Sequence, residues 1–336
     1  MLKGRHRNEG VYIKKIGKER LKNWYYNITY IMNRKYRKSL NEVKRNFRTL
    51  TEDKKEALQQ CLLSHYYRSE SLHSIQKQDL EDHLFYRLSG FRHRTIPWLN
   101  SIKALNRCKV LEIGCGTGCT TIALAEQGCN VTSIDVNEES IKVAQKRCEL
   151  YGLPAKISAL NATEINEIGE KFDFIIFPDS LEHMTYSERI TALSKAWTML
   201  NIDAPSFLVV IGTPNRLYFF DRHSSLLPFY DWLPDEIAMQ YAKHSPRQEC
   251  INSNRDKMTF LRFGRGASYH EFELALKTQY TALTAFDMWS FMQTPIFTKM
   301  AHRDEYKYMK LLKRLGPKDL PEGFYCEQLH IAIRKT

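Results

Sequence analysis

The sequence feature that most constrains the fold of this chain is a glycine-rich stretch, KVLEIGCGTGCTTIALA, at residues 109–125. The apolar, β-branched segment at residues 110–113 predicts a buried strand, and residues 120–128 predict a helix that ends at Gly128. The three alternating glycines therefore form the turn between strand and helix. Because glycine permits positive φ angles and lets a ligand approach the main chain closely, the turn predicts a cofactor site.

Two other glycine motifs do not fit this turn. A dinucleotide-binding fingerprint ends in Gly or Ala, but Cys119 or Thr121 stands at that place, depending on the frame. A phosphate-binding loop ends in Gly-Lys-Ser/Thr, and no lysine lies between Lys109 and Lys142. What remains is an acidic residue, one spacer and G-x-G-x-G.

The next segments predict further strands of a parallel sheet. Residues 131–134 form an apolar run that ends at Asp135, and an amphipathic helix follows. A carboxylate at the carboxyl end of a second strand, 21 residues after the first glycine, is well placed to bind both hydroxyls of a ribose. The alternative is an N-cap for the helix, although Asn137 can fill that role. Residues 155–161 and 172–177 predict the third and fourth strands.

This order of motifs resembles the class I S-adenosylmethionine-dependent methyltransferases, from about residue 106 to residue 212 and again at the last strand. The resemblance implies an α/β fold, a Rossmann-like, doubly wound sheet of seven strands, with residues 281–289 and 327–335 in its last two strands. It also implies S-adenosyl-L-methionine as the cofactor and S-adenosyl-L-homocysteine as the product.

The same resemblance implies which residues bind the cofactor. Glu112 is expected to hold the ammonium group of its methionine part, and Asn161 to lie near the adenine, although a turn-forming asparagine is an open alternative. The full set of expected cofactor-binding residues is Glu112, Gly114, Cys115, Gly116, Gly118, Asp135, Val136, Asn161, Ala162 and Asp179.

The residues after the fourth strand bear on the chemistry. Amino-methyltransferases of bases have an Asn/Asp-Pro-Pro-aromatic motif there and carbon-5 pyrimidine enzymes have Pro-Cys, whereas this chain has PDSLEHM. Its LEH part resembles O-methyltransferases of the ubiquinone pathway. His183 is the first candidate for a general base, because imidazole titrates near neutrality. Glu182 or Asp179 is expected to orient it, and a structural histidine is the alternative.

A metal-dependent variant of this site is also considered. Asp179, Glu182 and His183, together with His223, resemble the carboxylate and histidine set that binds a divalent metal in some ubiquinone-pathway enzymes and in small-RNA 2′-O-methyltransferases. Such ligands suit magnesium or manganese. Since Asp stands here in place of the family's Glu, its reach is shorter. We therefore expect catalysis by His183, His223 and Glu182 without a metal, and keep magnesium as the alternative.

An inserted lobe, at about residues 214–280 and 290–325, is expected to bind the methyl acceptor. Core packing of the lobe is the alternative explanation for its aromatic residues. The expected acceptor pocket consists of Tyr218, Phe219, Phe220, Asp221, Arg222, His223, Phe229, Tyr230 and Trp232.

Two helices with a break at Gly90 are expected before the first strand. In the resembled family such helices cover the cofactor. Arg87, Arg92 and Arg94 are therefore candidates for binding the cofactor carboxylate or an anionic substrate, and surface positions on a helix are the alternative.

Positive charge is concentrated at the N-terminus. The net charge of the 336 residues is +12, and residues 1–55 contain 17 Lys and Arg against five Asp and Glu, so the remainder is neutral overall. We accordingly divide the chain into a basic helical extension, residues 1–70, and a methyltransferase domain, residues 71–336. The extension contains a predicted amphipathic helix whose apolar stripe consists of Leu21, Tyr25, Ile28 and Met32.

The sequence predicts an enzyme that transfers a methyl group to an oxygen of a small molecule, a glycan or a lipid-linked acceptor. The chain has no long apolar run and no secretory leader pattern, so a cytoplasmic location is expected. Residues 1–55 are expected to contact an anionic membrane surface or a polyanion, or to pack on the body. An RNA 2′-O-methyltransferase and a catalytically silent interaction module that binds the cofactor remain the alternatives, and the oligomeric state is not predicted.

Overall fold

The structure is a computed structural model that describes residues 34–69, 71–247, 256–284 and 303–335. The predicted amphipathic helix with its stripe at residues 21–32 lies outside this part of the chain. So does the second half of the expected sixth strand, beyond residue 284.

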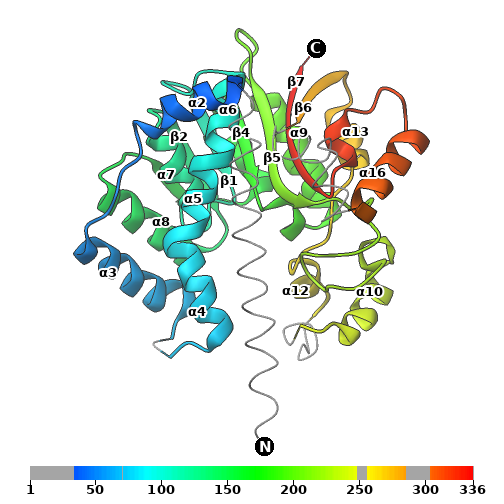
Figure 1. Cartoon of the computed structure of the whole chain (residues 1–336), viewed down its shortest axis with the longest axis horizontal. Helices are drawn as coiled ribbons and strands as arrows, with labels where there is room; N and C mark the ends of the chain where they lie inside the picture. The colour runs from blue at the N-terminus through cyan, green and yellow to red at the C-terminus, as the bar shows by residue number, and fades with distance from the viewer. Residues whose placement is uncertain (1–33, 70, 248–255, 285–302, 336) are drawn as a thin grey trace, which may run out of the picture.

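A seven-stranded sheet in the order β3-β2-β1-β4-β5-β7-β6 forms the centre of the fold (Figure 1). Strands β1 to β5 are parallel to one another, and β7 runs antiparallel between β5 and β6. The order confirms the fold class that the resemblance implies. The strands are β1 (Lys109–Ile113), β2 (Asn130–Asp135), β3 (Lys156–Ala159), β4 (Phe174–Pro178), β5 (Phe207–Pro214), β6 (Tyr280–Thr284) and β7 (Gln328–Lys335).

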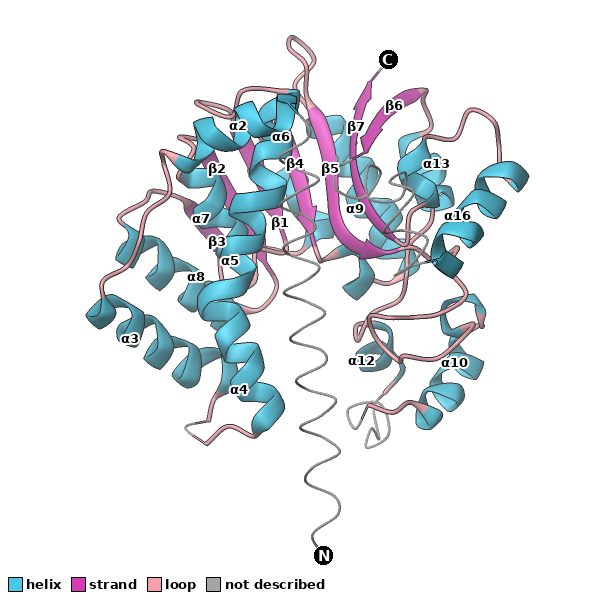
Figure 2. Ribbon diagram, viewed as in Figure 1, coloured by secondary structure: helices cyan, strands magenta, loops and turns pink. Residues whose placement is uncertain are grey.

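Helices cover both faces of this sheet (Figure 2). On one face, Leu111 of β1 belongs to a core shared with α9 (Tyr186–Met199) and α13 (Tyr269–Leu276). On the other face, the neighbouring Val110 belongs to a core shared with α7 (Cys119–Ala125) and α8 (Glu138–Tyr151). Because successive side chains of a strand point to opposite faces, a strand buried on both sides reads as a continuous apolar run.

The helical region before β1 is continuous, and the expected break at Gly90 is wrong. Gly90 has a φ of −58° and lies inside the helical path. Burial of Leu88 and Ile96 in one core outweighs the cost of about 1 kcal/mol that glycine brings to a helix interior. The path consists of α4 (Ser74–Glu81), a π-helical turn (Asp82–Tyr86), α5 (Arg87–Gly90), a second π-helical turn (Phe91–Thr95) and α6 (Ile96–Ile102).

Residues 34–69 pack on the body of the protein and share its core. They contain α2 (Arg34–Lys44), α3 (Glu52–Cys61) and a π-helical turn (Leu62–Tyr67). Leu58 belongs to a core cluster with Val143 and Leu150 of α8. Among the described residues, the same cluster therefore includes Leu58 and Leu72, which lie on the two sides of the boundary that we expected near residue 70.

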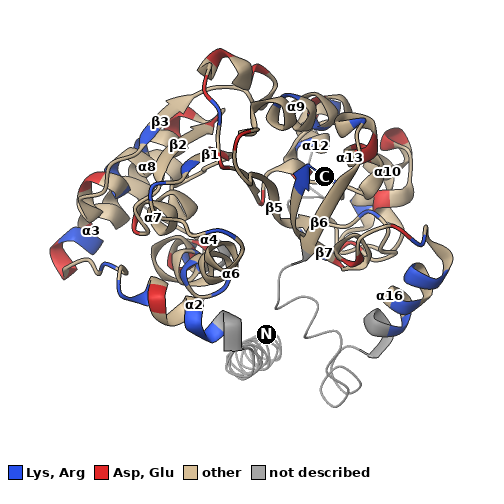
Figure 3. Cartoon of the chain, turned by 90° about the horizontal axis from the view of Figure 1, so that it is seen from above, with Lys and Arg blue, Asp and Glu red and all other residues tan. Residues whose placement is uncertain are grey.

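Some of the basic residues of this segment have structural partners. The guanidinium of Arg48 donates to the carbonyls of Tyr151 and Gly152 at the end of α8, at 3.0 and 2.8 Å. These contacts satisfy carbonyls that a helix C-terminus leaves unpaired. Figure 3 shows the Lys and Arg residues of the described part spread over several elements, among them α2, α3 and α16 (Arg303–Leu315).

The inserted lobe is smaller than expected. It contains α10 (Asp235–Tyr241) and α12 (Lys257–Leu261), which enclose a small core that includes Leu227, Tyr230 and Phe260. The following α13 packs against α9 in the layer on the sheet, so the first part of the lobe ends before residue 269 and not at residue 280. Within the described residues, no helix has the length and apolar character that a bilayer crossing requires.

Leu58→Ala tests whether residues 34–69 fold with the body. Leu58 is 1% exposed, so we expect the free energy of unfolding to fall by about 2–5 kcal/mol, in a single transition that includes the sheet. Urea denaturation followed by circular dichroism and tryptophan fluorescence measures this. The exposed Gln59→Ala on the same helix is the control and should stay within about 0.5 kcal/mol. A main transition unchanged by Leu58→Ala would mean that the segment folds separately.

Candidate functional site

A cavity of about 810 Å³ lies at the carboxyl ends of the parallel strands. Open α/β sheets bind ligands at this edge, where the loops that leave the strands diverge. The cavity is bounded by the glycine turn, by the three π-helical turns before β1, by the loop after β4 and by the start of β7. Figure 1 shows α4 and α12 on opposite sides of this edge. The volume is in the usual range for a small-molecule site.

The glycine turn follows the main-chain conformation that its sequence predicts. Gly114, Gly116 and Gly118 have φ angles of +87°, +49° and +83°. A Cβ atom on Gly114 would lie 2.5 Å from Cβ of Ser180, and one on Gly118 would lie 2.9 Å from Cβ of Ala144. A Cβ atom on Gly116 would meet nothing within 4 Å. Gly118 therefore serves packing against α8 and does not line the cavity, whereas Gly116 leaves open space for a ligand.

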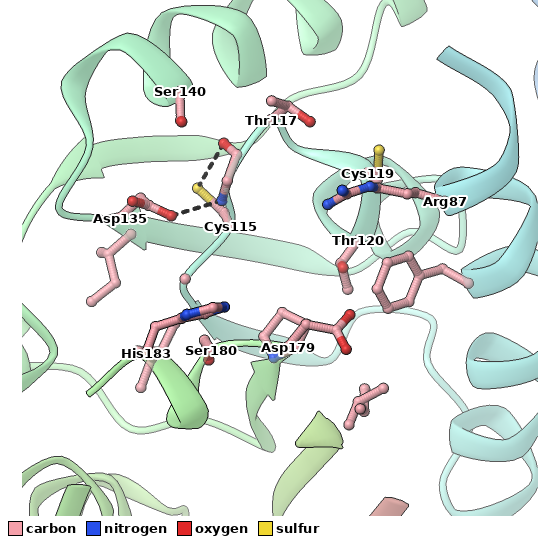
Figure 4. Close-up of a pocket in the computed structure, with 18 of the residues that line it drawn as sticks. Arg87, Cys115, Thr117, Cys119, Thr120, Asp135, Ser140, Asp179, Ser180 and His183 are labelled. Carbon is pink, nitrogen blue, oxygen red and sulfur yellow. Dashed lines mark hydrogen bonds between the residues drawn. The ribbon is translucent and has the colours of Figure 1, made fainter. Parts of the chain in front are cut away.

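Asp135 links the end of β2 to the glycine turn (Figure 4). One carboxylate oxygen accepts the N–H of Gly116 and the other accepts the N–H of Asn137, both at 2.8 Å. Asn137 caps α8 by accepting the N–H groups of Glu139 and Ser140, so the N-cap alternative for Asp135 is wrong. Both oxygens keep further acceptor capacity, and the side chain lines the cavity.

Glu112 does not reach the cavity, contrary to the expectation that it holds the cofactor's ammonium group. Its carboxylate is fully buried beneath the turn and accepts the hydroxyls of Thr121 and Ser133 at 2.5 and 2.7 Å. Its other oxygen, Oε1, has no hydrogen-bond partner. Burial raises the pKa of Glu112 to about 7. The residue therefore ties β1 to α7 and β2 instead of contacting a ligand.

Asp179 lies on the cavity wall with a strained main chain. Its φ is +44°, which is uncommon outside glycine, and its N–H donates to Ile211 at 2.8 Å. A Cβ atom on Gly212 would overlap the Asp179 carboxylate, so glycine is required beside it. Desolvation by the surrounding walls, together with the Glu182 carboxylate, raises the pKa of Asp179 to about 6.

The three candidate arginines have different surroundings. Arg87 and Arg94 line the cavity. Arg87 also donates to Asp79 at 2.9 Å, and Figure 4 shows it across the cavity from Asp135. Arg92 forms an ion pair of 2.5 Å with Glu126 away from the cavity, so it is excluded as a ligand-binding residue.

The remaining expected cofactor residues line the cavity: Cys115, Val136, Asn161 and Ala162. The side chain of Asn161 accepts the N–H of Thr163 at 2.9 Å, so it has the turn-forming role that was the alternative. This role does not remove it from the cavity wall.

His183 and His223 come together although 40 residues separate them in the sequence. Their ring centroids are 5.6 Å apart, and both rings line the cavity. His183 Nδ1–H donates to the carbonyl of Arg262 at 2.9 Å. Since a carbonyl only accepts, this bond leaves Nε2 of His183 with the lone pair. Burial lowers the pKa of His183, and burial and His183 lower the pKa of His223 to about 4.

Glu182 does not orient His183 as expected. It is fully buried, accepts the hydroxyl of Thr213 at 2.9 Å, and faces His223 Nε2 at 3.8 Å through an oxygen that has no hydrogen-bond partner. Burial raises the pKa of Glu182. Within the described residues, Glu182, His183 and His223 each offer one ligand atom to a common point, and Asp179 is not part of this group.

The expected aromatic acceptor pocket is wrong except for His223. The other eight residues do not line the cavity. Tyr230 belongs to the core of the lobe, whereas Phe219, Phe229 and Trp232 are exposed on its surface. Asp221 accepts the main-chain N–H groups of residues 223–225. The lobe's aromatic residues therefore do not form an acceptor pocket at this cavity.

Other cavity residues were missed from the sequence: Tyr66, His83, Arg262, Gln328 and His330. The sequence does contain a signal for Gln328 and His330. Since β7 is antiparallel, its first residues lie at the edge where the parallel strands end. His330 interrupts the apolar run there. Nothing in the sequence points to Arg262, which enters from the lobe.

Comparisons with known proteins agree with this geometry. The sequence profile of a family described as "Methyltransferase domain" matches residues 110–203. A ubiquinone biosynthesis O-methyltransferase of Rhizobium etli is 29% identical over 116 residues, which are 34% of this chain and 45% of that protein. A protein of the same name from Pseudomonas fluorescens is 27% identical over 126 residues, 37% of this chain and 53% of that one. The chain thus spans about half the length of these relatives.

Among solved structures, magnesium protoporphyrin IX methyltransferase from Synechocystis PCC 6803, with bound SAH, is similar to this chain. The TM-score is 0.36 at 23% identity, over 45% of this chain and 67% of the other.

Glu112→Gln tests the buried carboxyl. A pKa raised from 4.5 to about 7 means that the folded state binds the proton more tightly, so stability falls as pH rises through this range. We expect wild type to lose about 2–3 kcal/mol between pH 5 and pH 8 relative to the variant. Urea denaturation at several pH values measures this. The exposed Glu149→Gln removes a surface charge as the control, and equal slopes for wild type and Glu112→Gln would refute the assignment.

Proposed function

Because this chain carries a methyltransferase domain of the class I, S-adenosylmethionine-dependent type, we propose that it transfers a methyl group from S-adenosylmethionine to an oxygen of a small-molecule or glycan acceptor. The printed name of the relatives, ubiquinone biosynthesis O-methyltransferase, supports an oxygen acceptor.

The observation that carries the proposal is the pairing of Asp135 with a glycine turn that leaves space above Gly116. In this proposal the free lone pairs of Asp135 bind the ribose hydroxyls, and Asn161 and Ala162 border the adenine. Arg87 and Asp179 face the charged groups of the methionine part. When bound, the cofactor supplies an electrophilic methyl group on its sulfonium.

The residues of the chain then have to align the acceptor and remove its proton. His183 is suited to this task, because its Nδ1–H is held by the carbonyl of Arg262 and its Nε2 retains the lone pair. Burial lowers the pKa of this imidazole, which favours the neutral form with Nε2 available to accept a proton. His223 lines the adjoining wall of the acceptor site, and the buried Glu182 lies behind it, with its Oε1 3.8 Å from Nε2 of His223.

Polar side chains in the lining of the cavity support a hydroxyl-bearing polar acceptor. Arg262, Gln328 and His330 are among the residues that line it, and the lobe's exposed aromatics are not. An RNA 2′-hydroxyl is also polar, and the RNA 2′-O-methyltransferase stays the alternative within the same chemistry. A silent cofactor-binding module is the alternative without chemistry. Contact of residues 1–55 with an anionic membrane or a polyanion stays a separate proposal.

Binding of the cofactor is the first test. We expect S-adenosylhomocysteine to bind with micromolar affinity in calorimetry, and Asp135→Ala to weaken it about tenfold or more, because charge-assisted hydrogen bonds to the ribose are lost. Glu138→Ala, an exposed carboxylate on the first turn of α8, is the matched control and should bind normally. Absence of binding to folded wild type would sink the proposal.

Metal dependence is tested separately, because the convergence of Glu182, His183 and His223 favours a divalent ion as a second candidate. Our proposal expects that EDTA leaves S-adenosylhomocysteine binding unchanged and that Mg²⁺ and Mn²⁺ titrations give no saturable binding. Saturable Mn²⁺ binding that His223→Gln abolishes would replace the general-base proposal with a metal-activated hydroxyl.

A further inference from the structure

The turn of residues 262–266, which joins α12 to α13, contacts both histidines of the site. The carbonyl of Arg262 accepts Nδ1–H of His183 at 2.9 Å. The carbonyl of Gly264 accepts the hydroxyl of Ser224 at 2.8 Å, and the Ser224 oxygen lies 3.1 Å from Nδ1 of His223. A single turn of the inserted lobe therefore holds one histidine directly and the other through a serine.

These bonds decide which nitrogen of each ring carries the proton. The hydroxyl proton of Ser224 is used in its bond to Gly264, so its oxygen is left to accept from Nδ1–H of His223. His183 donates through Nδ1 for the reason already given. Both rings then keep Nε2 as the atom with the lone pair, and Nε2 of His223 is the atom that faces Glu182.

A buried arginine of α9 joins this turn to the loop after β4. Arg189 of α9 is 3% exposed, and its guanidinium donates to the carbonyls of Arg265 and Gly266 at 2.5 and 2.8 Å. The same guanidinium donates to the carbonyls of Leu181 and Glu182, at 2.8 and 3.3 Å, in the loop that carries His183. The lobe and the loop after β4 are thus held in one geometry.

The centre of the turn requires glycine, because neither its main-chain conformation nor the space around it accommodates a side chain. Gly264 has a φ of +129°, which L-residues rarely adopt. A Cβ atom there would lie 2.5 Å from Oγ of Ser224 and 3.0 Å from Nδ1 of His223. The glycine therefore permits the contact between the turn and the Ser224–His223 pair.

We propose that the turn 262–266 is a positioning element that sets the tautomers of His183 and His223, with Ser224 as the positioning residue of His223. This inference rests on the proposed function for its catalytic meaning. The inserted lobe then acts on the chemistry of the site as well as covering it.

The test is direct observation of the tautomers by long-range ¹⁵N–¹H NMR of selectively ¹⁵N-histidine-labelled full-length protein at pH 8. The signals are assigned with His183→Gln and His223→Gln. In wild type we expect both histidines to carry the proton on Nδ1. Ser224→Ala should move the proton of His223 to Nε2, where Glu182 Oε1 can accept it, and leave His183 unchanged. Ser245→Ala, another buried serine of the lobe, is the control and should change neither ring.

If wild-type His223 carries its proton on Nε2, the inference is wrong. This result needs no variant, so the test remains decisive even if Ser224→Ala misfolds. An unchanged His223 in folded Ser224→Ala would overturn it as well. The Ser224→Ala variant should bind S-adenosylhomocysteine within about twofold of wild type, because Ser224 does not line the cavity. Failure of wild type to bind that ligand would count against the proposed function, whereas the tautomers are read in the ligand-free protein and judge the turn alone.

Discussion

The close approach of the glycine turn to β4 and α8 is the constraint on which the cavity depends. Gly114 lies against Ser180 and Gly118 against Ala144, at distances that admit no Cβ atom. Any side chain at either glycine would push the strand end or the helix away. The bond from Gly116 N–H to Asp135 then joins the turn to β2. The part of the cavity beside the glycine turn is therefore shaped by main chain, and Asp135 contributes a carboxylate to it.

The part of the cavity around His183 and His223 depends on a different kind of contact. Its walls come from segments far apart in the sequence, and the guanidinium of Arg189 joins two of them through their carbonyls, with Glu271 at 3.4 Å as its counter-ion. A buried cation is costly unless its hydrogen bonds and charge are satisfied, and here both conditions are met. Because a guanidinium presents its donors in a fixed plane, it holds the loop after β4 and the turn of the lobe at one relative position.

Sequence reasoning found what depends on local spacing. The strand, turn and helix around Gly116 and the position of Asp135 follow from patterns a few residues long, whereas the seven-stranded sheet was expected from the family resemblance. Glu112 was misjudged because its side chain points into the layer between β1 and α7, where Thr121 binds it, and not toward the cavity, whereas Asp135 at the last position of β2 reaches the cavity. Gly90 was misjudged because burial of its neighbours overrides its helix propensity. The prediction of an aromatic acceptor pocket in the lobe was wrong because composition does not show which way Tyr230 or Phe219 faces.

The residues of the cavity also divide into those inside the region that matches the family profile and those outside it. Residues 110–203, which match the family profile, contain Asp135, the glycine turn and His183. The match does not include His223 and Arg262, which contact His183, or His330, which lines the same cavity. In the proposed function, the general base His183 is held by the carbonyl of a lobe residue, so its orientation is set outside the region that matches the family profile. The proposed acceptor then has to fit the geometry of this lobe as well as the geometry of the matched region.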